Sequence, residues 1–350
     1  MRVVVVGATG NVGTSLVAAL AEEPRVESVV GVARRLPGLV VPKTEWARAD
    51  IAVDDLGPLF RGADAVVHLA WLIQPTRDPE RLWEVNVAGS TRLFVAARDA
   101  GVSTLAYASS IGAYSPRVSD VPVDESWPTD GVAQNAYSRQ KAEVERRLDR
   151  FEQEATDMRV VRMRPAVTCK YESATAQRRI FAGPFLPGRL VRRRVVPAVP
   201  DVRGLRVQAV HSDDVADGYR RALLTEVRGA FNLAAAPVLV PADLARLLDA
   251  RLVRVPTRAL RAAAAAAWRL RVTPVPADWL DLALAVPTLD ASRAERELGW
   301  RPRFSAAEAV ADVLRGIRAG AGLDTPPLSE RTSGRLRSRE LATGVGARDR

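Results

Sequence analysis

Tyr137 and Lys141 are the pair of residues with the clearest chemical meaning. Their spacing of four places the phenol and the ammonium on one face of a helix. A neighbouring cation lowers the pKa of a phenol toward neutrality, so Tyr137 could exchange a proton with a substrate hydroxyl or carbonyl while a hydride moves to or from a nicotinamide. Lysine is rare in this chain, so the pairing is poorly explained by chance. The alternative is an exposed amphipathic helix with an incidental tyrosine.

Two serines, Ser109 and Ser110, directly follow an apolar segment that is predicted to be a strand, residues 104–108. Ligands of open α/β folds bind at the carboxyl ends of the strands. A hydroxyl at this position could hold the reacting oxygen beside Tyr137.

A glycine-rich turn joins the first predicted strand to the first predicted helix. It reads Gly7-Ala8-Thr9-Gly10-Asn11-Val12-Gly13. Gly7 permits a tight turn, Gly10 lets the backbone approach a pyrophosphate, and Gly13 allows the helix to contact the strand. The helix N-terminus adds a positive field. We interpret the segment as a dinucleotide-binding turn, the alternative being a βα turn without a ligand.

The residues after the second predicted strand favour NADP over NAD. An NAD site usually places an acid at the end of the second strand, whereas this chain has Ala33-Arg34-Arg35. A guanidinium at Arg34 suits a 2′-phosphate, although a solvated basic loop is the alternative. Asp50 and Ile51 follow a further short strand, where a carboxylate could meet the adenine amino group.

Strands and helices alternate over the first half of the chain. Apolar segments predict strands at 2–6, 26–33, 63–69, 104–108 and 159–163, and helical spacing predicts helices at 11–23, 80–100 and 136–154. This alternation predicts an α/β fold, a Rossmann-type doubly wound parallel sheet, with a smaller C-terminal substrate-binding lobe.

The chain divides into three predicted parts. Residues 1–165 form mainly the NAD(P)-binding domain, and 166–320 form the substrate lobe together with the last Rossmann elements. Prolines and fading periodicity predict an irregular segment over 166–208. Residues 321–350 are rich in Pro, Gly, Ser, Arg and Glu, which predicts a disordered tail.

Composition limits the class of protein. The 350 residues are 47% hydrophobic and 26% charged, a balance typical of soluble globular proteins. We expect a cytoplasmic protein because the sequence shows neither a secretory signal nor an apolar run of about 18 residues. With only one cysteine, Cys169, and two isolated histidines, we expect neither an internal disulfide nor a metal site.

The net charge of +10 arises mainly from arginine. Eight arginines face the single acid Asp201 within residues 178–206: Arg178, Arg179, Arg189, Arg192, Arg193, Arg194, Arg203 and Arg206. They could clamp an anionic substrate or form a solvated basic flap.

Ordered motifs extend over most of the chain. They are Gly7-x-x-Gly10-x-x-Gly13, Asp50-Ile51, His68-Leu69-Ala70, Asn86-Val87-Ala88-Gly89-Ser90, Ala108-Ser109-Ser110, Tyr137-x-x-x-Lys141, Arg164-Pro165, His211-Ser212-Asp213-Asp214-Val215-Ala216, Phe231-Asn232-Leu233 and Glu297-Leu298-Gly299-Trp300-Arg301-Pro302. From residue 2 to about residue 316, the sequence thereby resembles the extended short-chain dehydrogenase/reductase superfamily, and within it the NAD-dependent epimerase/dehydratase family.

The resemblance implies roles for individual residues. Ser110 rather than Ser109 is then the catalytic hydroxyl, Tyr137 is the acid/base, and Lys141 also binds the nicotinamide ribose. Leu69 and Ala70 belong to a loop packed on the dinucleotide, and the loop at Pro165 lies beside the carboxamide. By the same resemblance, Asn86 braces the site, and both histidines are structural.

Two departures from the family pattern narrow the activity. Dehydratases of nucleotide sugars usually follow the catalytic Ser or Thr with Asp-Glu, whereas this chain has Ile111-Gly112, which disfavours a sugar 4,6-dehydratase. The segment Trp71-Leu72-Ile73 is bulkier than is common. It either makes the mouth of the site apolar or packs against the substrate segment.

The leading hypothesis is an NAD(P)-dependent oxidoreductase or epimerase. It would transfer a hydride reversibly at a secondary alcohol or ketone of a small molecule, a nucleotide sugar being one candidate. The alternative is a catalytically idle NAD(P) sensor with a protein or nucleic-acid partner. We expect no membrane partner and disfavour a nucleic-acid partner. The family resemblance implies a homodimer as one option, formed through the helices predicted over 80–100 and 136–154.

Overall fold

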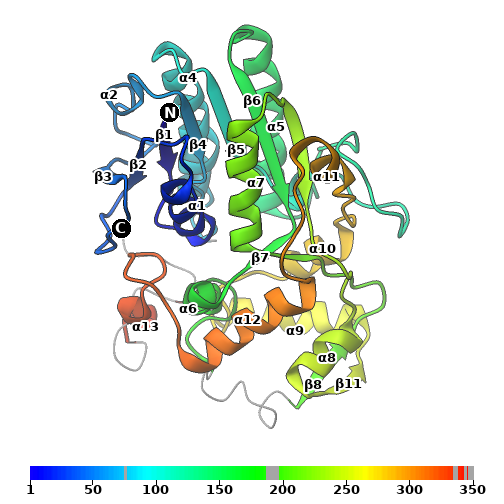
Figure 1. The fold of residues 1–350 in the computed structure, drawn as a ribbon. Coiled ribbons are helices and arrows are strands. Elements are labelled where there is room, and N and C mark those ends of the chain that lie inside the picture. Colours follow the sequence, from blue (N-terminus) through cyan, green and yellow to red (C-terminus); the bar gives the residue numbers. More distant parts are fainter. Residues whose placement is uncertain (75–76, 187–196, 334–337, 343–344, 346–350) are drawn as a thin grey trace.

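The computed structural model describes residues 1–74, 77–186, 197–333, 338–342 and 345. Seven parallel strands form the central sheet in the order β10-β6-β5-β4-β1-β2-β3 (Figure 1). The strands are β1 (Arg2–Val6), β2 (Ser28–Ala33), β3 (Thr44–Arg48), β4 (Ala65–His68), β5 (Thr104–Ala108), β6 (Arg159–Pro165) and β10 (Gly229–Leu233). The chain winds outward from β1 to one edge, then returns to β4 and winds to the other edge. The predicted doubly wound Rossmann-type sheet is confirmed.

The valines of β1 show why this strand lies at the centre of the sheet. Val3 and Val5 belong to the core on one face of the sheet, and Val4 and Val6 belong to the core on the other. Successive side chains of a strand point to opposite faces, so an unbroken apolar run fits a strand that is covered on both sides.

Helices cover both faces of the sheet (Figure 1). One face packs against α1 (Asn11–Glu22), α7 (Ser212–Leu224) and α11 (Ser292–Leu298). The other face packs against α2 (Gly57–Phe60), α4 (Gly89–Asp99) and α5 (Ala136–Glu154). The helix predicted over 80–100 is divided into α3 (Pro79–Trp83), a π-helical turn (Glu84–Ala88) and α4.

The smaller lobe lies beyond the carboxyl edge of the sheet (Figure 1). Its helices are α6 (Ala174–Gln177), α8 (Pro241–Leu248), α9 (Thr257–Arg269), α10 (Asp278–Ala285) and α12 (Ala306–Ala319). Two short strand pairs add to it: β8 (Ala198–Asp201) with β11 (Arg251–Arg254), and β7 (Val167–Cys169) with β9 (Ala209–His211). Within the described ranges, no helix combines the length and apolar character that crossing a membrane requires.

The C-terminal segment 321–333 packs against the sheet edge. Thr325 and Leu328 are buried, and the Thr325 hydroxyl donates a 3.0 Å hydrogen bond to the carbonyl of Thr9 in the glycine turn. Glu340 in α13 (Ser338–Ala342) forms a buried ion pair with Arg178. Residues of the predicted disordered tail thus have partners far away in the sequence.

Candidate active site

A cavity of about 520 Å³ lies at the carboxyl edge of the sheet and extends from the glycine turn to α10. Its lining includes most of the residues that the sequence predicts for the site: Gly7, Thr9, Gly10, Asn11, Val12, Gly13, Arg34, Asp50, Ile51, Leu69, Ala70, Ser110, Tyr137 and Pro165. Ala8 and Lys141 are not among the lining residues; both are buried beside the cavity.

The three glycines of the turn differ in what surrounds them. A Cβ on Gly7, where φ is +88°, would lie 2.6 Å from the nitrogen of Ala70, and a Cβ on Gly13 would lie 2.4 Å from the carbonyl oxygen of Gly7. A Cβ on Gly10 would meet only that carbonyl, at 3.4 Å. Gly10 is the N-cap residue of α1, whose first turn contains no acidic residue. The turn therefore leaves backbone N–H groups and a helix N-terminus available to a diphosphate.

Arg34 and Asp50 line the other end of the cavity, where the dinucleotide turn would direct an adenosine. The side chain of Arg34 follows β2 and is partly exposed. Its pKa is lowered because the partial burial beside the cavity outweighs the charge of Asp50, which acts to raise it. The carboxylate of Asp50 pairs with Arg81 at 3.2 Å and accepts from the N–H of Ala52.

Tyr137 lies in the first turn of α5. The N-cap residue Asn135 fixes the start of this helix, because its side chain accepts from the N–H of Ser138. Ser110 follows β5 and lines the same cavity as Tyr137, and its hydroxyl accepts from the N–H of Gly112 at 3.0 Å. Burial raises the pKa of Tyr137, while the hydroxyl of Ser110 acts to lower it. The lowering of this pKa that the spacing predicts is therefore not found.

Lys141 lies one turn after Tyr137, but its ammonium points to the end of β5. The Nζ atom donates to the carbonyl of Ala108 at 2.6 Å and lies 3.5 Å from the ring centroid of Trp71. Burial lowers the pKa of Lys141 well below its ordinary value, and the charge of Glu145 acts to raise it. Trp71 thus covers the lysine and also lines the cavity, which supports the apolar-mouth interpretation of its bulk.

A buried charge network lies directly behind these residues. Glu145 is fully buried and accepts from Arg164 at 2.9 and 3.0 Å and from Arg162 at 2.8 Å. Ser109 donates its hydroxyl to the same carboxylate. Although burial raises it, the charges and hydrogen bonds of the two arginines lower the pKa of Glu145 to about 2. Sequence reasoning missed Glu145, and the signal was its position four residues after Lys141.

Both histidines have structural surroundings. The Nε2 atom of His68 lies 2.8 Å from the hydroxyl of Ser90, and burial, assisted by the charge of Lys141, lowers the pKa of His68 to about 3. His211 caps α7 through the N–H of Asp213.

Asn86 braces the loop after β4. Its carbonyl oxygen accepts from the N–H of Leu72 at 2.7 Å, and its amide donates to the carbonyl of Leu72 and to Gln140, each at 2.8 Å. These bonds hold the loop that carries Trp71 against α5.

Aromatic rings surround Tyr137. Its ring centroid is 5.4 Å from that of Trp279 in α10 and 5.9 Å from that of Trp71, and Phe181 lies 5.2 Å from Trp279. Sequence reasoning missed Trp279 and Phe181, since no local spacing connects them to Tyr137. A Cβ on Gly112 would lie 2.8 Å from the tyrosine ring, so the glutamate of the dehydratase pattern would clash here.

The described arginines of the 178–206 cluster do not line the cavity. Arg178 pairs with Glu340, Arg179 donates to the carbonyl of Pro327, and Arg206 pairs with Asp120. Arg189, Arg192, Arg193 and Arg194 lie outside the described residues.

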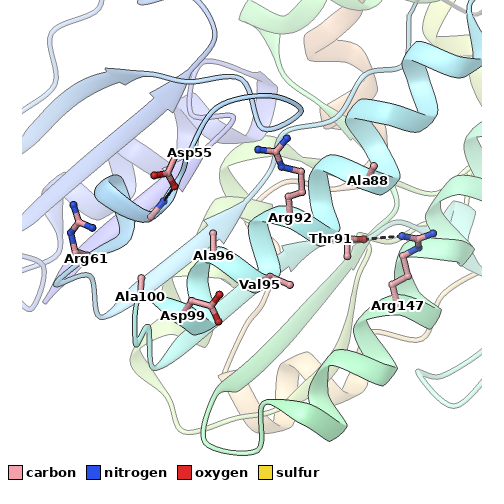
Figure 2. A pocket seen from close by; sticks show the side chains of 11 residues that line it. Asp55, Arg61, Ala88, Thr91, Arg92, Val95, Ala96, Asp99, Ala100 and Arg147 are labelled. Carbon is pink, nitrogen blue, oxygen red and sulfur yellow. Dashed lines mark hydrogen bonds between the residues drawn. The ribbon is translucent and has the colours of Figure 1, made fainter.

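A second hollow, of about 630 Å³, lies between α2, α4 and α5 (Figure 2). Two arginines in its wall are already engaged: Arg92 donates to backbone carbonyls of residues 52–54, and Arg147 donates to Glu143 and Thr91. This hollow shares no described lining residue with the first cavity. The first cavity therefore remains the candidate site.

A seven-stranded parallel sheet with a glycine turn and a Ser-Tyr pair at one cavity defines a Rossmann-fold protein of the dinucleotide-binding class. The model of the NAD dependent epimerase/dehydratase family matches residues 3–234, and the chain belongs to this family. The resemblance found in the sequence is thereby confirmed.

Similar proteins were found both by sequence and among solved structures, and they carry different names. An uncharacterized protein of Mycobacterium tuberculosis (strain ATCC 25618 / H37Rv) is 25% identical over 326 residues, which cover 90% of this chain and 83% of that protein. The UDP-glucose 4-epimerase of Thermotoga maritima with UDP-glucose aligns with a TM-score of 0.70 at 20% identity, covering 91% of this chain and 99% of the other. The UDP-glucuronic acid 4-epimerase of Bacillus cereus in complex with NAD aligns at 0.68 and 17%, with the same coverage.

Proposed function

We propose that this protein catalyses reversible hydride transfer between a nicotinamide dinucleotide and a secondary alcohol or ketone of a small molecule. The observation that carries the proposal is the Ser110–Tyr137 pair in the same cavity as the glycine turn. Ser110 would hold the substrate oxygen, and Tyr137 would donate or accept its proton.

The cavity suits a dinucleotide because Gly10 presents an open backbone at the N-terminus of α1. The glycine turn would hold the diphosphate, and the loop at Pro165 would lie beside the carboxamide. A bound nicotinamide would supply the hydride acceptor or donor. Lys141 would bind the nicotinamide ribose only after a shift of Trp71, which covers the ammonium.

Identifying the dinucleotide that co-purifies with the protein tests this proposal. The protein is purified without added cofactor and denatured, and the released nucleotide is identified by chromatography. A near-stoichiometric nucleotide supports an epimerase cycle that oxidises and re-reduces one substrate. An empty protein that binds added dinucleotide supports an exchanging reductase or dehydrogenase. If the empty protein binds neither NAD(H) nor NADP(H), the proposal is wrong.

We further propose that NADP is preferred over NAD. Arg34 lines the cavity after β2, at a position where an NAD site usually carries an acid. Replacing Arg34 by alanine should weaken NADPH binding by about 10- to 100-fold, the worth of a charge-assisted hydrogen bond, and leave NADH binding nearly unchanged. Equilibrium titration of both nucleotides measures the ratio.

Arg35→Ala is the matched control, because Arg35 is also exposed but does not line the cavity. The preference for NADP would be refuted by a wild-type protein that binds NADH at least as tightly as NADPH, or by equal losses in the two variants.

We also propose a homodimer through α4 and α5. Val95 of α4 and Trp83 of α3 are exposed apolar side chains on this side of the molecule. Val95→Arg should raise the dimer dissociation constant by at least about tenfold, because it places a charge in an apolar contact. Sedimentation velocity over a concentration series measures this, with Leu36→Arg, at an exposed leucine elsewhere, as the control. A wild-type protein that stays monomeric at all concentrations contradicts the proposal.

A further inference from the structure

We infer that the substrate of this site is uncharged and carries a flat apolar ring beside its carbonyl or hydroxyl group. This inference rests on the proposed function and specifies its substrate class. The observation behind it is the apolar aromatic wall around Tyr137, formed by segments 71–73, 180–181 and 279–286.

The wall surrounds the reacting end of the cavity. Trp71 and Trp279 lie 5.9 and 5.4 Å from the Tyr137 ring, and Phe181 meets Trp279 nearly edge-on at an interplanar angle of 75°. Leu282 and Ala283 of α10, and Val286 directly after this helix, continue the same surface. Ring centroids in favourable aromatic pairs lie about 4.5–7 Å apart, so a planar ring beside these residues would find edge and face partners.

Phe181 is a part of this wall that no other described residue covers fully. It leaves 38% of its surface exposed although it lines the cavity next to Trp279. An apolar ligand that covers this ring removes its exposed surface from water, which favours binding.

The distribution of charged residues along the cavity also supports an uncharged substrate. Among the described residues that line the cavity, Arg34 and Asp50 are the only charged ones, and both lie at the end predicted for adenosine. Nearby amides are already used: Gln177 donates to the carbonyl of Thr168 and to Ser173, and Gln74 donates to the carbonyl of Ile180. None of the described lining residues at this end would give an anionic substrate a cationic partner in exchange for its lost hydration, and burying an unpaired charge is costly.

Position adds a further argument. The carboxylate of Asp278 accepts a 3.1 Å hydrogen bond from Asn135, the N-cap residue of α5. This bond ties the start of α10 to the start of α5 and so holds Trp279 beside Tyr137. The aromatic wall is therefore built onto the helix that carries the acid/base residue.

The test compares ligands that differ in charge but share a ring system. Binding of 2-acetylnaphthalene, of 6-acetyl-2-naphthoic acid and of UDP is measured by calorimetry, with the protein saturated with the oxidised dinucleotide so that no ketone is consumed. We expect the neutral ketone to bind at least about tenfold more tightly than its carboxylate, since the carboxylate would be desolvated without a partner. No detectable binding of the neutral ketone up to its solubility limit, or tighter binding of the acid or of UDP, would overturn the inference.

Variants of the aromatic wall test whether it accounts for the binding of the neutral ketone. Trp279→Ala and Phe181→Ala should each weaken binding of the neutral ketone by about tenfold, because ring contacts are lost. Trp279→Phe should retain most of the affinity. Phe185→Ala is the control, because Phe185 is exposed and lies outside the cavity. Unchanged affinity in both alanine variants would also overturn the inference.

Activity distinguishes this inference from the proposed function. Turnover of a UDP-sugar without binding of the neutral ketone would retain hydride transfer and reject the apolar substrate class. Tight binding of the ketone that depends on Trp279, with no hydride transfer to any ketone, would retain the apolar site and reject the proposed reaction.

Discussion

Replacing Tyr137 by phenylalanine is expected to lower kcat by roughly 10²- to 10⁴-fold, the usual contribution of a positioned acid or base. Dinucleotide affinity should change little, because the glycine turn and Arg34 are untouched. The phenol shares the cavity with the hydroxyl of Ser110 and with the glycine turn. Steady-state assays and dinucleotide titration on the same samples measure the two effects.

The pH dependence gives this prediction a second readout. Because burial raises the pKa of Tyr137, the phenol stays protonated through the neutral range. Ketone reduction, which consumes that proton, should therefore be insensitive to pH near 7. Alcohol oxidation, which needs the phenolate as the base, should become faster as pH rises. Tyr137→Phe should remove this rise.

Tyr171→Phe removes the same atom outside the cavity and serves as the control. A Tyr137→Phe protein that retains more than half of the wild-type kcat would exclude Tyr137 as the acid/base. A wild-type protein that binds dinucleotide and transfers no hydride, and is not altered by the substitution, would instead support the sensor alternative.

The second large effect is expected at Glu145, which we propose to be a positioning residue. Glu145→Leu leaves Arg164 and Arg162 without their shared buried carboxylate, and breaking a buried ion pair costs about 3–5 kcal/mol in the free energy of unfolding. Ser109 also loses its hydrogen-bond acceptor, so the end of β5 that carries Ser110 should be held less firmly and kcat should fall. Urea unfolding monitored by circular dichroism measures the stability.

Glu143→Leu is the matched control on the same helix. Glu143 pairs with Arg146 and Arg147 near the surface, where a salt bridge is worth at most about 1 kcal/mol. Equal losses of stability in the two variants would contradict the role assigned to Glu145.

Lowering the pH should also test the charge network around Glu145. The pKa of Glu145 is about 2 in the folded protein, below its ordinary value of 4.5. The stability contributed by this depressed pKa is fully present above about pH 4.5 and is lost as pH falls toward 2. The unfolding free energy of the wild type should therefore fall more steeply with acid than that of Glu145→Leu.

Local patterns in the sequence determined the sheet and most of the residues that line the proposed cofactor end of the cavity. The valines of β1, the glycine turn and the spacing of Tyr137 and Lys141 each act within one or two adjacent elements. The carboxyl ends of parallel strands meet at one edge, so residues that follow those strands gather there even when their side-chain contacts are unknown. Ser110 and Arg34 were predicted in this way, Pro165 was implied by the family resemblance, and the structure places all three in one cavity.

Tertiary structure alone decided the environment of these residues. Spacing placed Lys141 on the face of Tyr137, but packing turned its ammonium toward Ala108 and Trp71, and burial reversed the expected pKa shift of the phenol. Trp279 and the segment 321–333 come to the cavity from distant parts of the chain, so their contacts leave no local periodicity. Hydrogen-bond direction, desolvation and long-range packing depend on neighbours in space, and for these residues the sequence order does not reveal which neighbours those are.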